Sequence, residues 1–411
     1  MSKAVEATPR TSASGDTEAQ QQKIQSEHVD RAEDIHVDGE QGKFSAILGI
    51  LRKLVGVADV VDFVGFMCQR IPESDDAVER MLAVLAWWFS KMLKHTGKVH
   101  KPFNSILGER FFCHWDVSSS SSQCSSESTA SSSITNVSTG AEATNRVEYI
   151  TEQVSHHPPV SAFVYRCKER GIEAAGMDHI KAKFTGLSAT VATGSECKGI
   201  FITLKSRGNE MYKCTHPTGS IVGWLRGSLK VQMIETSYIV CAKTGLAAVV
   251  EFKEERWFSK DKGNVIGKVF RYDESKYGDQ IASWRLKDIP KACSIVATFG
   301  GNWDQQVTVK HNGSERTLID MAALKIADKI VKPLEQQGEL ESRRVWEPVA
   351  SKMRQGKYAE ASRTKKAIEE AQRTLAAERK ERGEEFVPAL FKPNYADSGM
   401  PELLDDAPIN I

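Results

Sequence analysis

The hydrophobic and polar positions of this chain follow a helical period at both ends and a strand-like pattern between them. From residue 43 apolar side chains recur at i, i+3, i+4 and i+7, which predicts an amphipathic helix. A second helix is predicted from Asp75 to Lys94, capped by Ser74 or Asp75, and its run MLAVLAWWF indicates that it is buried. A long charged helix is predicted from Ser362 to Arg382. The apolar face of the first helix consists of Phe44, Ile47, Leu48, Leu51, Leu54 and Val55.

Between these helices lie short segments rich in Val, Ile, Thr and aromatic residues, separated by Gly, Asn and Asp. Because no helical pattern interrupts them, they favour an antiparallel meander that is closed as a barrel or folded as a sandwich. The predicted strand segments are 145–154, 197–205, 237–243, 246–253 and 293–301.

Composition divides the chain into a domain and flanking segments. Residues 1–40 are polar, charged and poor in aromatics, which predicts a disordered tail. The serine-rich run 117–144 predicts a flexible insertion. We therefore expect one domain at 41–395 that contains this insertion, followed by a C-terminal tail at 396–411. The longest apolar run, 81–89, is far shorter than the roughly 20 residues needed to span a bilayer.

Charge and cysteine content limit the kind of partner. Lys and Arg total 55 against 54 for Asp and Glu, so no net field directs the molecule to nucleic acid, and any anion site must be local. The eight cysteines are scattered and include no CxxC pair, which is typical of reduced thiols in a cytoplasmic protein.

The stretch TEQVSHHPPV at 151–160 places two histidines before two prolines. Pro158 pushes His157 into extended geometry, and in a strand His156 and His157 point to opposite faces. They are therefore not expected to share a metal unless a turn intervenes, and no HExxH motif or nearby Asp/Cys set supplies further ligands. Ser155 lies outside a GxSxG elbow. Spacing alone favours a structural pair in a rigid turn, with anion binding second.

A second candidate segment is KPFNSILGERF at 101–111. Lys101 precedes a proline and is held in extended geometry. Asn104, Ser105 and Gly108 suit a tight turn that exposes backbone donors. Taken singly, one lysine beside a turn is usually a surface lysine.

The third candidate lies on the last helix. Lys365, Glu369 and Arg373 are spaced by four, so they share one face, and Glu369 is placed to hold both cations. By itself such a set is most often a solvated ladder of salt bridges.

Taken together, these segments resemble the oxysterol-binding protein family. The resemblance covers residues 43–392, and it rests on EQVSHHPP at 152–159, KPFNSILGE at 101–109, WWFS at 87–90, SRRVWEPV at 342–349 and KAIEEAQR at 366–373. It implies a mainly β fold with helices: a near-complete antiparallel β-barrel around a hydrophobic tunnel, with an N-terminal amphipathic lid and a C-terminal helical subdomain. The helix from Phe44 to Val55 occupies the place of the lid, although an ordinary helix packed on the core would show the same period.

The resemblance also implies a function without a chemical step, a cofactor or a metal. The tunnel would take one sterol or the acyl chains of one phosphatidylinositol 4-phosphate, and a monomer in transient contact with membranes would exchange the two lipids. Phosphatidylserine as the second lipid, or a lipid sensor or scaffold with little transport, remain alternatives. The matched headgroup positions are Lys101, Phe103, Asn104, His156, His157, Lys365, Glu369 and Arg373.

Three features depart from the family pattern. The connection at 57–77 is shorter than usual, the serine-rich insertion is uncommon, and Ala389 stands where a basic residue is frequent. None of them touches the headgroup set.

Overall fold

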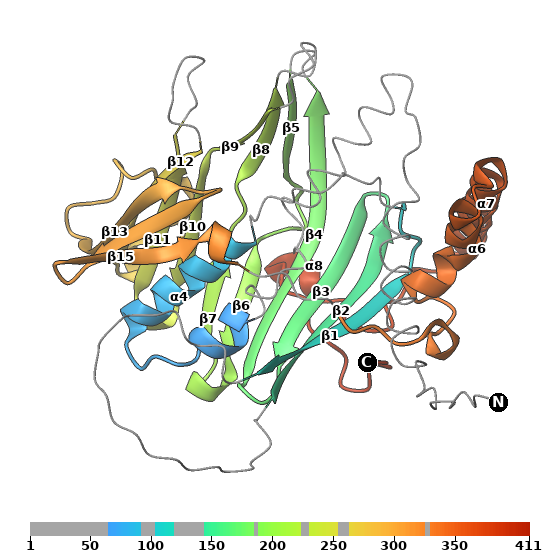
Figure 1. Cartoon of the computed structure of the whole chain (residues 1–411), viewed down its shortest axis with the longest axis horizontal. Coiled ribbons are helices and arrows are strands. Elements are labelled where there is room, and N and C mark those ends of the chain that lie inside the picture. Colours follow the sequence, from blue (N-terminus) through green and yellow to red (C-terminus); the bar gives the residue numbers. More distant parts are fainter. Residues whose placement is uncertain are drawn as a thin grey trace, which may run out of the picture.

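The computed structural model describes residues 65–91, 103–118, 144–184, 188–222, 230–253, 263–324 and 329–411. Within these ranges the chain forms a large antiparallel sheet of 15 strands with a few helices (Figure 1). The predicted lid helix from Phe44 to Val55, the tail 1–40 and Lys101 lie outside them. None of the helices in these ranges is both long enough and apolar enough to cross a bilayer.

The strands follow one another mostly as hairpins, so neighbours in sequence are usually neighbours in the sheet. Twelve strands form a continuous path in the order β1-β2-β3-β4-β6-β7-β10-β11-β12-β13-β14-β15, while β5, β8 and β9 extend from β4 as a second sheet. The strand bounds are β1 (Arg110–Ser118), β2 (Thr144–His156), β3 (Pro159–Cys167), β4 (Ile172–Phe184), β5 (Ser188–Thr193), β6 (Ile200–Leu204), β7 (Glu210–Cys214), β8 (Thr218–Val222), β9 (Lys230–Ile234), β10 (Thr236–Cys241), β11 (Leu246–Phe252), β12 (Asn264–Arg271), β13 (Ser294–Asn302), β14 (Gln306–His311) and β15 (Ser314–Asp320).

The two longest helices of the described residues, α4 (Ala77–Ser90) and α7 (Tyr358–Glu381), lie toward opposite ends of this path. α4 contacts β11 and β15, whereas α7 extends away from the sheet on the side of β1 and β2 (Figure 1). Each predicted strand segment contains most of one observed strand, although some ends differ: 197–199 precede β6, and 242–243 belong to a 3-10 helix that follows β10. The segments 145–154, 197–205, 237–243, 246–253 and 293–301 correspond to β2, β6, β10, β11 and β13. The other helices are α5 (Glu274–Tyr277), α6 (Ser342–Arg354) and α8 (Tyr395–Ser398).

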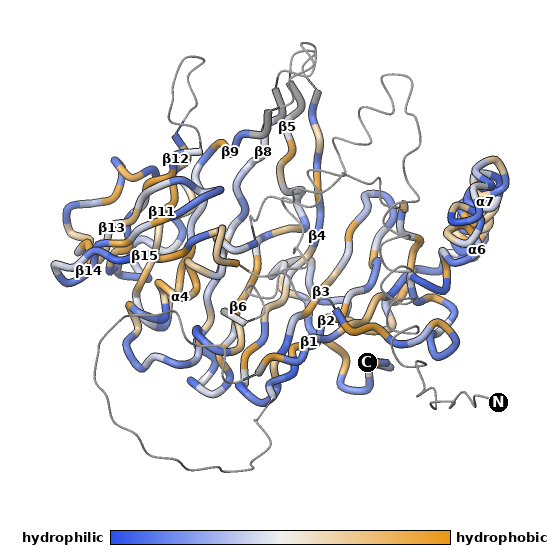
Figure 2. The backbone as a smooth tube through the Cα atoms, viewed as in Figure 1, coloured by the Kyte–Doolittle hydropathy of each residue, from blue (hydrophilic) through white to orange (hydrophobic). Residues whose placement is uncertain are grey.

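Alternating side chains of the strands enter different hydrophobic clusters. On β1, Cys113 and Trp115 join the large interior cluster around α4, whereas Phe112 points to a second cluster on the opposite face. The interior cluster also takes Phe299 from β13, near the other end of the strand path. Strands from both ends thus surround one interior, as in an incomplete barrel, and hydrophobic positions run along them (Figure 2).

α4 is buried as its apolar run predicts, but it is capped one residue later than expected. The side chain of Asp76 accepts hydrogen bonds from the backbone N–H groups of Val78, at 2.6 Å, and Glu79, at 3.2 Å. Arg80 fixes the helix to β7, because its guanidinium donates two hydrogen bonds of 2.7 Å to the Glu210 carboxylate.

Two segments that the sequence predicted to be a flexible insertion and a C-terminal tail have structured parts. Val117, Ser118 and Thr144 belong to β1 and β2, and Ser118 pairs with Thr144. The serine-rich insertion therefore connects two paired strands. Residues 396–411 are not a separate tail, because side chains such as Leu403 and Ile409 pack on the second cluster, against the face of β1–β4 that points away from α4.

Candidate functional site

The two histidines lie where β2 turns into β3. β2 ends at His156 and β3 begins at Pro159, and the register of the two strands shifts between Gln153 and Ser155. The imidazole centroids of His156 and His157 are only 4.7 Å apart, with the rings at 80°. The expectation that they point to opposite faces is wrong, because the strand alternation ends at this turn. No group of three or more potential metal ligands is present in the described ranges.

His156 is fixed by the loop at 103–109. Its Nδ1 lies 3.1 Å from the backbone carbonyl oxygen of Ser105. Since a carbonyl only accepts, Nδ1 carries the proton and Nε2 of the neutral ring is left as an acceptor. Burial lowers the pKa of His156 below its usual value, and the neighbouring His157 lowers it further. His156 is therefore mainly neutral at pH 7, and its protonation would turn Nε2 into a donor.

A buried carboxylate holds the same loop in place. Glu109 accepts hydrogen bonds from the backbone N–H of Ile106 at 2.9 Å, from Ser342 Oγ at 2.7 Å and from Trp346 Nε1 at 3.1 Å. Gly108, at φ +79°, turns the loop so that its N–H donates to the Gln153 carbonyl of β2 at 2.9 Å. Glu109 thus ties the loop to α6, and Gly108 ties it to the strand that carries the histidines.

An aromatic stack joins the loop to α6, and a lysine of α7 lies over it. The rings of Phe103 and Trp346 are parallel within 5°, with centroids 4.6 Å apart. Lys365 of α7 places its ammonium 5.8 Å from the centroid of the Phe103 ring. Phe103 therefore positions a cation of the site, while Asn104 beside it is exposed.

The charges of α7 are paired differently from the prediction. Arg373 forms an ion pair of 2.9 Å with Glu370, not with Glu369. Both Glu369 and Arg373 act on His156, since the carboxylate raises and the guanidinium lowers the pKa of that imidazole. The site thus combines the histidine turn, the loop at 103–109 and the first half of α7, whereas Lys101 lies outside the described ranges.

A second buried carboxylate supports β2 from the other side. Glu152 is fully buried and accepts hydrogen bonds from the backbone N–H groups of Ala389, at 2.9 Å, and Leu390, at 2.8 Å. Burial raises the pKa of Glu152, and these two donors and Arg110 oppose that shift. Position 389 thus contributes a backbone group to the strand of the histidines, which is compatible with alanine there.

Sequence reasoning missed Glu109, Trp346 and the carbonyl of Ser105. Glu109 and Trp346 lie inside the matched segments KPFNSILGE and SRRVWEPV. The sequence match therefore pointed to both segments but not to the hydrogen bond between these two side chains. The two side chains are 237 positions apart, and no local periodicity links them.

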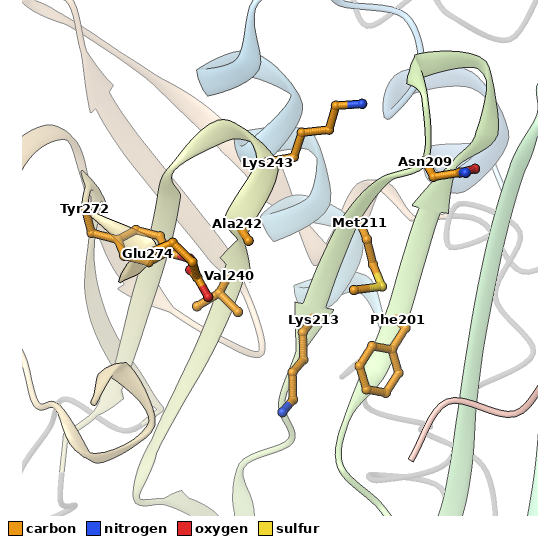
Figure 3. Close-up of a pocket in the computed structure, with 9 residues that line it drawn as sticks. All are labelled: Phe201, Asn209, Met211, Lys213, Val240, Ala242, Lys243, Tyr272 and Glu274. Atoms are coloured by element: carbon orange, nitrogen blue, oxygen red, sulfur yellow. The ribbon is translucent and has the colours of Figure 1, made fainter. Parts of the chain in front are cut away.

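A separate groove of about 350 Å³ lies on the face of the sheet that points away from α4 (Figure 3). On β7, Tyr212 and Cys214 enter the interior cluster, so the alternate side chains Met211 and Lys213 face this groove. It contains none of the predicted headgroup residues. Its lining consists of Phe201, Asn209, Met211, Lys213, Val240, Ala242, Lys243, Tyr272 and Glu274.

Comparisons with known proteins identify a family and related proteins. The model of the oxysterol-binding protein family matches residues 57–352. Oxysterol-binding protein-like protein 1 of Schizosaccharomyces pombe is 31% identical over 470 residues, which cover 89% of this chain and 90% of that protein. Human oxysterol-binding protein-related protein 5 is 30% identical over 333 residues, which cover 79% of this chain but only 32% of that protein.

Two solved structures share the fold. The crystal structure of the Osh1 ORD domain in complex with cholesterol has a TM-score of 0.57 and 22% identity, and the match covers 82% of this chain and 76% of that one. The Osh3 ORD of Saccharomyces cerevisiae in complex with PI(4)P has a TM-score of 0.55 and 16% identity, with 87% and 82% covered. The sheet described above thus has the fold of these two domains.

Proposed function

Because this chain belongs to the oxysterol-binding protein family, we propose that it binds one lipid at a time inside its sheet and exchanges sterol for phosphatidylinositol 4-phosphate between membranes. It would work in the cytoplasm as a monomer that contacts membranes transiently, without a chemical step. The lipid complexes of the Osh1 and Osh3 domains, which share the fold, support both lipids as candidates.

The observation that carries the proposal is the convergence of His156, His157 and Lys365 on the loop at 103–109. A phosphate monoester carries roughly −1.5 to −2 charge at neutral pH and needs several donors. Lys365 supplies a permanent positive charge, and His156 supplies one when it is protonated. The site is also fixed in advance by the Glu109 and Gly108 contacts, so little ordering is lost when a headgroup binds.

The remaining headgroup positions extend this set. We assign Arg373 as a second permanent cation, because its pair with Glu370 is exposed and can be exchanged for a phosphate. Glu369 would accept from inositol hydroxyls, Asn104 would contact the inositol and glycerol part, and Lys101 would add a third cation. Phe103 acts through Lys365, which lies over its ring.

The test offers liposomes with labelled sterol, phosphatidylserine and phosphatidylinositol 4-phosphate to the purified protein. We expect one phosphoinositide per protein, displaced by sterol; displacement by phosphatidylserine would change the second lipid, and a single binding event without repeated transfer would favour a sensor. Replacing His156 and His157 by Ala should abolish extraction of the phosphoinositide and leave sterol binding intact, since a sterol has no phosphate. Equal loss of both lipids would make the histidines structural and contradict the headgroup assignment.

The lid is tested by truncation. Deleting residues 1–40 should leave lipid binding unchanged, whereas deletion through Val55 should shorten the time for which a lipid is retained. Damage by the shorter deletion alone would contradict the proposed boundary at residue 41.

A further inference from the structure

A lysine is buried at the end of α4 without an ion pair to any carboxylate of the described residues. Lys91 caps this helix and is only 2% exposed. Its ammonium lies 2.9 Å from His216 Nδ1 and 5.1 Å from the centroid of the Trp88 ring. No carboxylate in the described part of the chain forms an ion pair with it, and the segment 92–100 that follows contains no Asp or Glu. A buried charge in this setting is costly unless something compensates it.

The surroundings of Lys91 leave its ammonium ready to donate. Burial lowers the pKa of Lys91 to about 8, so most molecules still carry the charge at pH 7. Burial and this ammonium lower the pKa of His216 well below its usual value, so the imidazole stays neutral and its Nδ1 accepts one N–H. Among the described residues, Cys214, Cys197 and Asp178 partly oppose the downward shift of the Lys91 pKa.

The strand register places this lysine at the end of the barrel where the histidine turn lies. Asp178 of β4 pairs with Ser161 of β3, and the Ser161 hydroxyl donates to Gln153 of β2 at 2.6 Å. Gln153 and Ser161 directly flank the turn that carries His156 and His157. α4 itself runs through the interior cluster. Lys91 therefore lies inside the sheet, at the same end of the barrel as the headgroup site.

From these contacts we infer that the Lys91 ammonium, oriented by His216, is a lipid-binding point that takes an anionic oxygen of a glycerophospholipid. The anionic oxygen would belong to the phosphodiester or, in phosphatidylserine, to the carboxylate. Such a group would place a negative charge directly against the ammonium, where no carboxylate of the described residues forms an ion pair, whereas a sterol hydroxyl would bring no charge. The inference rests on the proposed function and adds a contact that favours a glycerophospholipid over a sterol.

The test compares wild type with Lys91→Met and with Lys213→Met, a lysine of the outer groove whose ammonium lies 5.9 Å from the Phe201 ring centroid. Each protein receives phosphatidylserine, phosphatidylinositol 4-phosphate or cholesterol in phosphatidylcholine liposomes. We expect Lys91→Met to lower extraction of anionic phospholipid by about tenfold or more, with cholesterol unchanged. Loss with phosphatidylserine alone identifies the carboxylate, and loss with both identifies the phosphodiester. Lys213→Met should behave as wild type.

Other results distinguish a failure of the proposed function from a failure of the Lys91 contact alone. If wild type extracts no lipid, the proposed function fails. If wild type extracts lipid but Lys91→Met extracts all three equally well, or loses all three equally, the inference fails alone. Thermal melting without lipid supplies the second measurement, since Lys91→Met should melt at a higher temperature at pH 7 and the difference should shrink above pH 8, where Lys91 loses its proton. A difference in melting temperature between the two proteins that stays the same from pH 7 to pH 10 would show that the charge of Lys91 is already compensated without lipid, and would overturn the inference.

Discussion

α4 and α7 carry similar charged side chains in opposite settings. The Arg80–Glu210 pair joins α4 to the sheet with side chains only 6% and 5% exposed, whereas the Arg373–Glu370 pair on α7 is 65% and 61% exposed. Breaking a buried pair leaves an uncompensated charge, but an exposed pair contributes roughly 0–1 kcal/mol. The pair on α4 therefore serves the fold, while the pair on α7 can give its cation to a ligand at little cost.

The largest effect should follow from breaking the pair on α4. Arg80→Met leaves the Glu210 carboxylate buried without its cation, so the free energy of unfolding should fall by about 3–5 kcal/mol in urea denaturation. The matched change on α7, Arg373→Met, should alter it by less than about 0.5 kcal/mol. Equal effects of the two variants would remove the contrast between the helices.

For lipid affinity, in contrast to stability, the larger effect is expected from substitutions on α7. Lys365→Met removes a charge-assisted contact to phosphate, so affinity for phosphatidylinositol 4-phosphate should fall by about tenfold to a hundredfold. Lys380→Met, in the last turn of the same helix, is the control and should change affinity little. A liposome extraction assay in which both variants bind as wild type would show that α7 does not reach the headgroup.

A smaller effect is expected from the residue that connects the two sides of the site. Glu109→Ala removes the acceptor for Ile106 N–H and Trp346 Nε1, which should cost about 1–3 kcal/mol of stability and loosen the loop under His156. Phosphoinositide affinity should fall while sterol binding persists, and Glu109→Gln should restore part of it because the amide oxygen still accepts. Unchanged phosphoinositide binding by a folded Glu109→Ala protein would contradict the role of Glu109 in positioning this loop.

The outcome of the sequence predictions depended on how local each signal was. The apolar run of α4 and the charged run of α7 were sufficient to place both helices, although α7 begins at Tyr358 instead of Ser362. The side-chain period of a strand failed at His157 because β2 ends one residue before it. On α7 the spacings i+3 and i+4 both permit a pair, and Arg373 takes Glu370 at i+3.

Contacts between distant segments were beyond the reach of these local signals. The carboxylate of Glu109 meets Trp346, and the carbonyl of Ser105 meets His156, only after the sheet has formed. The strings KPFNSILGE and SRRVWEPV therefore identified the segments of the site but not the bonds between them.

Affinity for the phosphoinositide should depend on pH through His156, whose charge depends on protonation, unlike that of the lysine and arginine cations. The empty protein keeps His156 neutral at pH 7, because burial lowers its pKa, and the Ser105 carbonyl holds the ring proton on Nδ1. A bound phosphate favours the charged ring, so binding takes up a proton and affinity should rise as pH falls from 8 to 6.5, by at most about tenfold per pH unit.

The pH range of the titration must stay above the second pKa of the phosphate, about 6, because protonation of the phosphate weakens binding at lower pH. His156→Gln removes the titrating group, so its affinity should be lower and nearly independent of pH over the same range, as measured by phosphoinositide titration at fixed ionic strength. Lys365→Met should lower the affinity at every pH but keep the pH dependence of wild type, because a permanent cation does not titrate in this range. If wild-type affinity instead rose with pH, His156 would bind the phosphate in its neutral form, and the donors of the site would have to be His157 and the permanent cations alone.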